Sequence, residues 1–174
     1  MGSRSQDELD EEAVYALYER IEKPLYNVVY RWLWNPEDAR EVVQEAFTRL
    51  WGMRERVDVE TVEGLVYRIA LNLASSRRRR AKLLRWTSLD AVGERADDAP
   101  TEEDRITLEG ARSEVREAVD SLPEKLRRTV MLCELTDLKQ EEVARILGIP
   151  TGTVGSRRHR ALRLLRERLE SEHS

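Results

Sequence analysis

The chain is poor in the residues that disulfides, metal sites and membrane spans require. Its only cysteine is Cys133 and its only histidines are His159 and His173, which excludes an intramolecular disulfide and a Cys-paired zinc site. No run approaches the roughly 18 apolar residues that cross a bilayer, and the first residues are acidic, unlike a secretory signal. We therefore expect a cytoplasmic protein with no metal, no cofactor and no membrane insertion.

Proline and glycine are also scarce, while apolar residues recur three and four positions apart almost throughout. This periodicity predicts an all-α protein. We expect a first helix over about 13–34 and a second that starts after Asn35, whose side chain can cap it, with Pro36 in its first turn. The second helix should end at Gly52 as a left-handed cap. A third should run from about Val62 into an arginine run. Its expected buried residues are Leu65, Val66, Ile69, Ala70 and Leu73.

Two segments are too acidic to pack. Residues 1–12 hold five acids and one arginine, and residues 88–112 hold eight acids and three arginines. Such segments cannot bury enough apolar surface to offset their ordering entropy. We therefore predict two small helical domains: an acidic tail over 1–12, a three-to-four-helix bundle over 13–87, a flexible acidic linker over 88–112 and a second helical domain over 113–170, in which Cys133 is a small core residue.

The net charge of −4 conceals two basic blocks. Residues 77–86 contain six basic side chains and no acid, and residues 157–168 contain six arginines and one glutamate. Both are large enough to attract a polyanion. The arginines at 77–80 are either a helix end whose side-chain stems cover nearby leucines or, together with Tyr67 and Asn72, a surface for unpaired bases. Tyr67 can equally be a core residue.

Residues 140–162 have the spacing of a helix-turn-helix. A helix over about 141–147 ends at Gly148, which allows a positive φ, and a second helix opens near Thr151 and runs to about 169. Ala144 is small where the two helices cross, and Val154 packs the second helix on the first. Short hydroxyls and guanidiniums near the start of the second helix can enter a major groove: Thr153, Ser156, Arg157 and Arg160. Double-stranded DNA is the expected ligand.

The helix after Asn35 has a polar face opposite its apolar one. Its members are Asp38, Glu41, Gln44, Glu45 and Thr48. This acidic stripe is either solvated or docks on a basic protein partner. No residues around it supply a base, a nucleophile or a metal geometry, so no catalytic residues are expected.

Together these motifs resemble the extracytoplasmic-function (ECF) class of bacterial sigma factors. Residues 35–51 resemble sigma region two, residues 67–80 resemble the part that opens the minus-ten promoter element, and residues 122–161 resemble region four. The resemblance implies docking on the clamp region of core RNA polymerase through Asp38, Glu41, Gln44 and Glu45. It implies minus-ten contacts by Tyr67, Asn72, Arg77, Arg78, Arg79 and Arg80. It implies minus-thirty-five contacts by Thr153, Ser156, Arg157, His159 and Arg160. An anti-sigma factor is the usual control in the family and is therefore an implied partner.

The sequence departs from the family pattern near the recognition helix. Members usually carry a Ser or Thr cap where Lys139 stands, a basic residue at Gly155 and an apolar residue at Arg158. Glycine at 155 removes an expected DNA contact and weakens the helix by roughly 1 kcal/mol relative to alanine. We expect Arg158 either to stay partly exposed or to snorkel, with its stem over apolar surface and its charge in water.

The resemblance predicts a transcription initiation factor that lends promoter recognition and DNA melting to core polymerase and has no catalysis of its own. The main alternative is a stand-alone helix-turn-helix regulator that binds its site without polymerase, as a symmetric dimer. A nucleic-acid enzyme and a pure interaction adaptor are the others. Against a nucleic-acid enzyme, the sequence offers no compact set of nucleophile, base and metal ligands.

Overall fold

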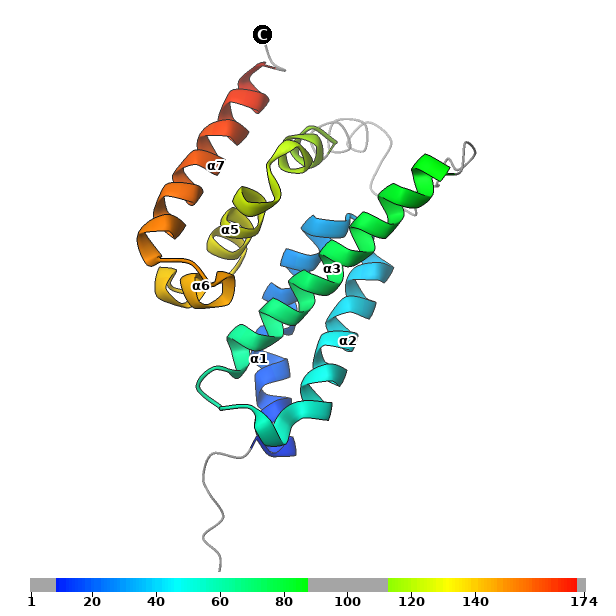
Figure 1. Ribbon diagram of the computed structural model, residues 1–174, viewed down its shortest axis with the longest axis vertical. Coiled ribbons are helices and arrows are strands. Elements are labelled where there is room, and N and C mark those ends of the chain that lie inside the picture. The colour runs from blue at the N-terminus through cyan, green and yellow to red at the C-terminus, as the bar shows by residue number, and fades with distance from the viewer. Residues whose placement is uncertain (1–8, 88–112, 172–174) are drawn as a thin grey trace, which may run out of the picture.

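The computed structural model describes residues 9–87 and 113–171, and Figure 1 shows them as packed helices. The helices are α1 (Glu11–Leu33), α2 (Pro36–Met53), α3 (Val62–Thr87), α5 (Glu124–Leu135), α6 (Gln140–Leu147) and α7 (Thr151–Ser171), with a short 3-10 helix η1 (Arg54–Arg56) and helical residues at 113–121. These residues contain no strand, which confirms the all-α prediction. Most of the expected acidic tail and all of the expected linker lie outside the described residues.

The junction between α1 and α2 is fixed by local hydrogen bonds. Trp34 ends α1 in the left-handed region, with φ 54°, and its backbone N–H donates to the Tyr30 carbonyl at 2.6 Å. The Asn35 side chain accepts from the backbone N–H groups of Glu37 at 2.9 Å and Asp38 at 3.0 Å. These bonds satisfy two of the free donors at the start of α2. The predicted cap at Asn35 is therefore confirmed.

The predicted end of α2 at Gly52 is wrong. The helix continues through Met53 and then tightens into η1, and the glycine does not adopt a positive φ. Arg54 itself stays in the right-handed region, and the Trp51 carbonyl accepts from its backbone N–H and, at 3.0 Å, from its side chain, which lies 4.2 Å from the centre of the Trp51 indole ring. The last turn is therefore closed by tighter 3-10 bonds, and no left-handed residue is needed to end the helix.

Helices α1, α2 and α3 pack on one another around a shared apolar core. The expected buried face of α3 is only partly right, because Val66 and Ala70 are buried whereas Leu65, Ile69 and Leu73 are half-buried. The fully buried residues also include Tyr67, Leu71 and Ala74. Helix α3 contacts α6 as well as α1 and α2, so its burial extends around more of its circumference than one stripe.

Helices α5, α6 and α7 form a second group that contains the predicted helix-turn-helix. Gly148 ends α6 with φ 65°, and the next backbone N–H, that of Ile149, donates to the Ala144 carbonyl at 3.0 Å. Val154 is fully buried where α7 begins. The predicted turn and its packing are confirmed. Cys133, expected in the core, is only half-buried.

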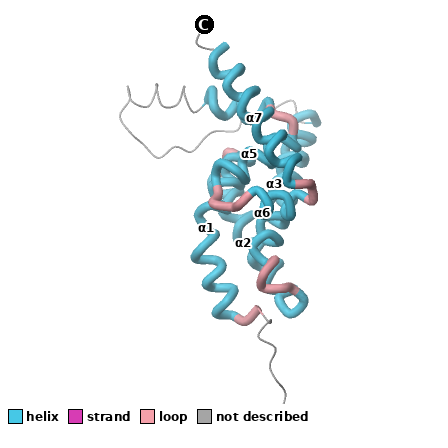
Figure 2. The backbone as a smooth tube through the Cα atoms, turned by 90° about the vertical axis from the view of Figure 1, so that its left-hand side faces the viewer, coloured by secondary structure: helices cyan, strands magenta, loops and turns pink. Residues whose placement is uncertain are grey.

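The two groups of helices lie against each other (Figures 1 and 2). Helix α6 contacts α3, and α5 contacts α1. Met131, Leu132, Val143 and Ile146 from the second group belong to the same apolar cluster as the core of the first. We call α1–α3 the first half and the described residues from 113 onward the second half.

Candidate functional site

The N-terminal part of α7 carries the five residues predicted to contact the minus-thirty-five element. Ser156, His159 and Arg160 are exposed, and Thr153 and Arg157 are half-buried. The Ser156 hydroxyl donates to the Thr153 carbonyl at 3.1 Å, within the helix itself. Across the part of the chain that the structure describes, neither Arg157 nor Arg160 forms an ion pair. Their guanidinium donors are therefore available to a ligand.

The departures from the family pattern have local explanations. Arg158, half-buried as expected, donates from Nε to the Glu134 carboxylate on α5 at 2.5 Å, so an ion pair joins α7 to α5 where an apolar contact is usual. The backbone N–H of Lys139 donates to the Glu142 carboxylate at 2.7 Å. Glu142 thus supplies the half of a capping box that belongs to the third helical residue, whereas a Ser or Thr at 139 would supply the other half by accepting from the backbone N–H of Glu142.

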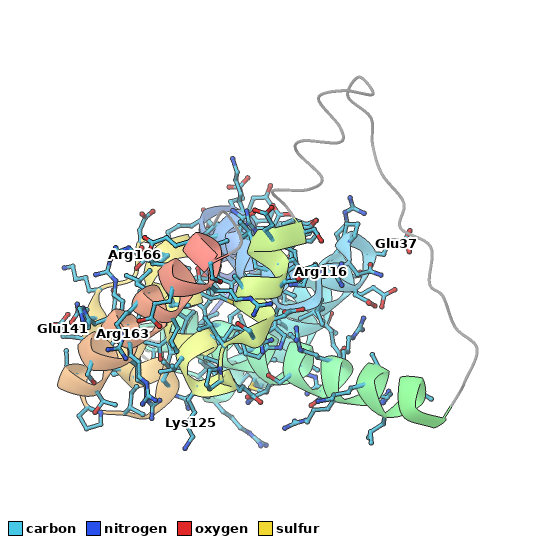
Figure 3. The ribbon with its side chains drawn as sticks, turned by 90° about the horizontal axis from the view of Figure 1, so that it is seen from above. Glu37, Arg116, Lys125, Glu141, Arg163 and Arg166 are labelled. Atoms are coloured by element: carbon cyan, nitrogen blue, oxygen red, sulfur yellow. The ribbon has the colours of Figure 1, made fainter. Side chains whose placement is uncertain are left out.

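The basic character of α7 continues beyond the predicted contact residues. Figure 3 shows Arg163 and Arg166 on the side of α7 that faces away from α3. Arg163 is 3.6 Å from Glu167, an exposed pair one turn apart. Such a pair contributes little to stability, so this part of α7 acts mainly through its positive potential.

The acidic stripe on α2 contacts the arginine run of α3, a pairing that the sequence did not indicate. Arg77 lies 3.1 Å from Asp38, 2.8 Å from Glu41 and 3.7 Å from Glu45. The hydrogen bond with Glu41 is the main cause that raises the pKa of Arg77 above its ordinary value. Gln44, the fourth predicted polymerase contact, is exposed. The positive charge of Arg77, a predicted DNA contact, is therefore neutralised by acids of the predicted polymerase surface.

An aromatic groove beside the acidic stripe was missed by sequence reasoning. It lies between α1 and α2, has a volume of about 630 Å³ and is lined by residues that include Tyr18, Val43, Gln44, Phe47 and Trp51. Tyr18 and Phe47 meet edge to face with ring centroids 4.9 Å apart, and Trp51 is 38% exposed. Phe47 and Trp51 belong to the apolar stripe of α2 and Tyr18 to the apolar side of α1, but these patterns alone do not separate residues of a groove from residues of the core. The groove makes this face suitable for a partner helix.

Two of the predicted minus-ten residues on α3, Tyr67 and Asn72, are engaged within the molecule, the first by burial and the second by a hydrogen bond to the second half. Tyr67 is 1% exposed, so the structure corrects the prediction that its ring is available to stack on a base in this arrangement. Asn72 accepts from Arg128 Nη1 on α5 at 3.3 Å. Arg128 also donates to the hydroxyl of Ser75 at 2.8 Å. The second half therefore occupies the polar face of α3.

The remaining arginines of the run differ in their surroundings. Arg78 donates to the Trp32 carbonyl at 3.1 Å and to the Asp120 carboxylate at 2.7 Å. Arg79 and Arg80 are exposed, and Arg79 makes a long contact of 3.4 Å with the Ser76 hydroxyl. Only the last two of the four predicted arginines present open guanidiniums.

Within residues 9–87 and 113–171, no helix combines the length and apolar character of a membrane span. The same residues contain no group of three or more histidines, cysteines and acids placed to hold a metal ion.

Two families match the chain, one in each half. Residues 17–83 match Sigma-70 region 2, and residues 112–165 match Sigma-70, region 4. The first match covers the core of α1–α3 and the arginine run. The second covers the helix-turn-helix and most of α7. The order of the two matches is that expected from the sequence motifs.

Curated relatives agree with these matches. The chain is 34% identical over 154 residues to the ECF RNA polymerase sigma factor SigE of Mycolicibacterium smegmatis, covering 86% of this chain but only 58% of that relative. It is 29% identical to the ECF RNA polymerase sigma factor SigW of Bacillus subtilis, covering 92% and 90% of the two chains. With the ECF RNA polymerase sigma-E factor of Escherichia coli K12 it shares 31% identity, covering 87% and 84%.

Solved structures have the same fold. CnrH, in complex with the cytosolic domain of CnrY, aligns with a TM-score of 0.70 at 23% identity, covering 93% of this chain and 90% of that chain. The sigma factor RpoE of Bartonella quintana, in complex with the anti-sigma factor NepR, aligns with a TM-score of 0.63 at 19% identity, covering 91% and 92%. From the two region matches and the full-length relatives together, the chain belongs to the ECF class of RNA polymerase sigma factors, which are transcription initiation factors.

Proposed function

We propose that this chain brings core RNA polymerase to promoters and opens the DNA there, while all bond making belongs to the polymerase. The observation that carries the proposal is the separation of two ligand faces of different chemistry. The start of α7 presents open guanidiniums, and the α1–α2 face presents acids beside an aromatic groove. Helices α7 and α2 lie on opposite sides of the molecule (Figure 1), so DNA and a protein partner can be bound at once.

The acidic stripe and the aromatic groove form the proposed docking surface for the clamp region of core polymerase. Asp38, Glu41, Gln44 and Glu45 supply polar and charged contacts, and the groove supplies apolar area at its edge. Complementary charge speeds association and fixes register, while a buried aromatic anchor contributes most of the affinity. Trp51 lines the groove and is 38% exposed, so its ring can be buried by the partner and is the proposed anchor of the complex.

The two halves have separate proposed DNA contacts. Residues 113–170 read the minus-thirty-five duplex through Thr153, Ser156, Arg157, His159 and Arg160, which line the accessible side of α7. Residues 13–87 bind the minus-ten element through α3. Its six proposed contacts are Tyr67, Asn72, Arg77, Arg78, Arg79 and Arg80. Because Tyr67 is buried, Asn72 is hydrogen-bonded to Arg128 and Arg77 is paired in this structure, minus-ten binding through these three residues requires a rearrangement.

An anti-sigma factor is a further proposed partner. CnrH is solved with the cytosolic domain of CnrY, and RpoE is solved with the anti-sigma factor NepR, which supports the same kind of control for this chain. We place the protein in the cytoplasm, where polymerase and DNA are found. A stand-alone regulator is less favoured, because it leaves the acidic stripe and its groove without a role.

Run-off transcription tests the proposed function. Purified chain is added to core RNA polymerase on a set of genomic promoter fragments, and defined start sites are expected only when both are present. Arg160→Ala should weaken binding to the selected promoter by about 1–3 kcal/mol if the side chain contacts a base, and equal loss on random DNA would assign it to a phosphate. Site-specific binding by a dimer without polymerase, and no transcript with it, would support the stand-alone regulator instead.

A further inference from the structure

Asp120 is the point at which the two halves are most closely joined by charge. It lies in the helical residues 113–121 of the second half and is only 28% exposed. Its carboxylate accepts from Arg78 Nη1 at 2.7 Å and from Trp34 Nε1 at 3.2 Å, both in the first half. One carboxylate thus receives hydrogen bonds from α3 and from the end of α1.

The groups that hold Asp120 form an anion site that belongs to the first half alone. Guanidinium and indole N–H groups can only donate, so both require an acceptor. Arg78 is held in place because it also donates to the Trp32 carbonyl at 3.1 Å. The guanidinium of Arg31 lies 5.7 Å from the Trp34 ring centroid and adds positive charge beside the site. Planar guanidiniums with a further donor are well suited to a phosphate oxygen.

The adjacent Arg77 shows why this site needs an external acceptor. Arg77 is paired with Asp38 and Glu41 of its own half and stays paired whatever the second half does. Among the described residues, Arg78 forms its only ion pair with Asp120, from the other half. If the halves separate, Arg78 and Trp34 lose their acceptor together, whereas Arg77 loses nothing.

The covered site continues along α3 as a strip of polar residues spaced three or four apart. Arg68 donates to the carbonyls of Arg145 at 2.8 Å and Ile146 at 3.2 Å, at the end of α6. Asn72 and Ser75 both contact Arg128 of α5. The strip therefore consists of Arg68, Asn72, Ser75 and Arg78. Arg68 and Asn72 are exposed, Arg78 is half-buried and Ser75 is buried, and every member contacts the second half, so a single separation breaks the hydrogen bonds of all four.

The contact between the halves also leaves polar groups without partners. Trp32 Nε1 and Arg127 Nε and Nη1 are buried and form no hydrogen bond. The Arg127 guanidinium lies 5.1 Å from the Trp32 ring centroid, and its Nη1 is 3.6 Å from the Asp120 carboxylate. Burial and the nearby Arg78 lower the pKa of Arg127. Unsatisfied donors and crowded cations oppose closure, and Asp120 is the anion that offsets them.

We propose that Asp120 occupies a phosphodiester-binding site, formed by Arg78 and the indole N–H of Trp34, that takes the backbone of single-stranded DNA when the halves separate. The second half therefore masks the strand-binding strip of the first with an internal substitute for phosphate, while α7 stays accessible. The inference rests on the proposed function for its ligand, because the open Arg79 and Arg80 follow Arg78 on the same helix.

Fluorescence anisotropy on the full chain tests this, with a labelled single-stranded oligodeoxythymidine of about 12 nucleotides, a length within the range of known single-strand sites. Asp120→Asn removes the internal anion and should tighten binding by about tenfold, the order of one charge-assisted hydrogen bond. Glu117→Gln is the matched control, since it changes charge equally on the same helical segment and, among the described residues, its exposed carboxylate is hydrogen-bonded only by Ser113, at 3.5 Å. That control should leave affinity near the wild-type value.

Two further variants separate unmasking from a general charge effect. Arg78→Ala in the Asp120→Asn background should abolish most of the gain. Gly64→Leu changes no charge but places a side chain where even a Cβ would lie 3.3 Å from Ile146 Cγ1, so it should separate the halves and also tighten binding. Circular dichroism establishes that each variant is folded, and Gly64→Leu provides the test if Asp120→Asn is not.

The outcomes are distinct. Equal affinities for Asp120→Asn and Glu117→Gln, or a gain that survives Arg78→Ala, would overturn the proposed site. Competition by poly-glutamate that exceeds competition by unlabelled oligonucleotide would assign the site to an acidic protein segment and also overturn it. Run-off transcription by the wild-type chain is scored separately. If the wild-type chain supports transcription and Asp120→Asn does not raise the affinity for the oligonucleotide, only this inference is refuted. If Asp120→Asn raises that affinity and the wild-type chain does not support transcription, only the proposed function is refuted.

Discussion

Alanine at position 155 should stabilise the recognition helix. Gly155 lies inside α7, and its φ is not positive. A Cβ added there would lie 3.8 Å from the Gln140 Oε1 atom, an ordinary van der Waals distance. Alanine is favoured over glycine in a helix interior by about 1 kcal/mol, and nothing in the surroundings opposes that gain. Gly155→Ala should therefore raise the free energy of unfolding by about 1 kcal/mol.

Gly148 provides the opposite control only seven residues away. It has φ 65°, and no atom lies within 4 Å of an added Cβ. The cost of alanine there comes from the left-handed backbone alone and is about 1–2 kcal/mol. Gly155→Ala and Gly148→Ala should consequently shift stability in opposite directions, although they make the same chemical change in the same helix-turn-helix.

Urea titration followed by circular dichroism measures both shifts. The midpoint should rise for Gly155→Ala and fall for Gly148→Ala with little change in slope, because neither substitution alters the surface exposed on unfolding. Duplex binding should be retained in Gly155→Ala, since the new methyl adds no charge. A lower midpoint for Gly155→Ala would refute the reasoning that space and backbone conformation decide the effect at these glycines.

Three further perturbations address the cap, the polymerase surface and the core. Asn35→Ala removes two hydrogen bonds from the start of α2 and should cost about 1 kcal/mol of unfolding free energy, whereas Asn27→Ala, on the exposed side of α1, should cost much less in the same titration. Glu41→Lys reverses a charge of the acidic stripe and should reduce co-purification with core polymerase, whereas Glu60→Lys should not; equal retention of the two would argue against docking through the stripe. Burial raises the pKa of Tyr67 above its ordinary value of 10.0, so the folded state holds the phenol proton more tightly, and this contribution is complete below pH 10 and declines above it. Tyr67→Phe should therefore reduce the loss of unfolding free energy between about pH 9 and about pH 11, and an unchanged loss would show that the pKa of Tyr67 is the same in the folded and unfolded states.

Local features of the fold were predictable from the sequence, because their causes lie within a few residues. Asn35 caps α2 through bonds that span two and three positions, and Gly148 ends α6 through its own backbone. The prediction at Gly52 failed because the helix tightens into 3-10 bonds at its end, where the Trp51 carbonyl accepts from the backbone and the side chain of Arg54. A glycine shows where a helix can end, whereas the hydrogen bonds of the last turn decide whether it does.

Contacts between distant segments were not predictable in this way. Arg77 and Arg78 are adjacent and chemically identical, yet one pairs with acids of α2 and the other with Asp120. Helical geometry turns their side chains to different directions, and only the packing of the two halves decides which acid each meets. The same packing places Arg128 of the second half in a hydrogen bond with Asn72, and Tyr67 is buried. The predicted list of α3 residues thus mixes open, paired and covered groups that a sequence pattern does not separate.

The surroundings of Trp34 make its fluorescence a measure of whether the two halves are in contact. Its indole N–H is bonded to a carboxylate, and guanidiniums from Arg31 and Arg116 lie 5.7 and 5.9 Å from the ring centroid. Two of these three neighbours, Asp120 and Arg116, come from the second half. Ultraviolet emission from this ring depends on the charges beside it, so its wavelength changes when they withdraw. With the other tryptophans replaced by phenylalanine, the emission of Trp34 follows the association and separation of the two halves in real time without any attached dye.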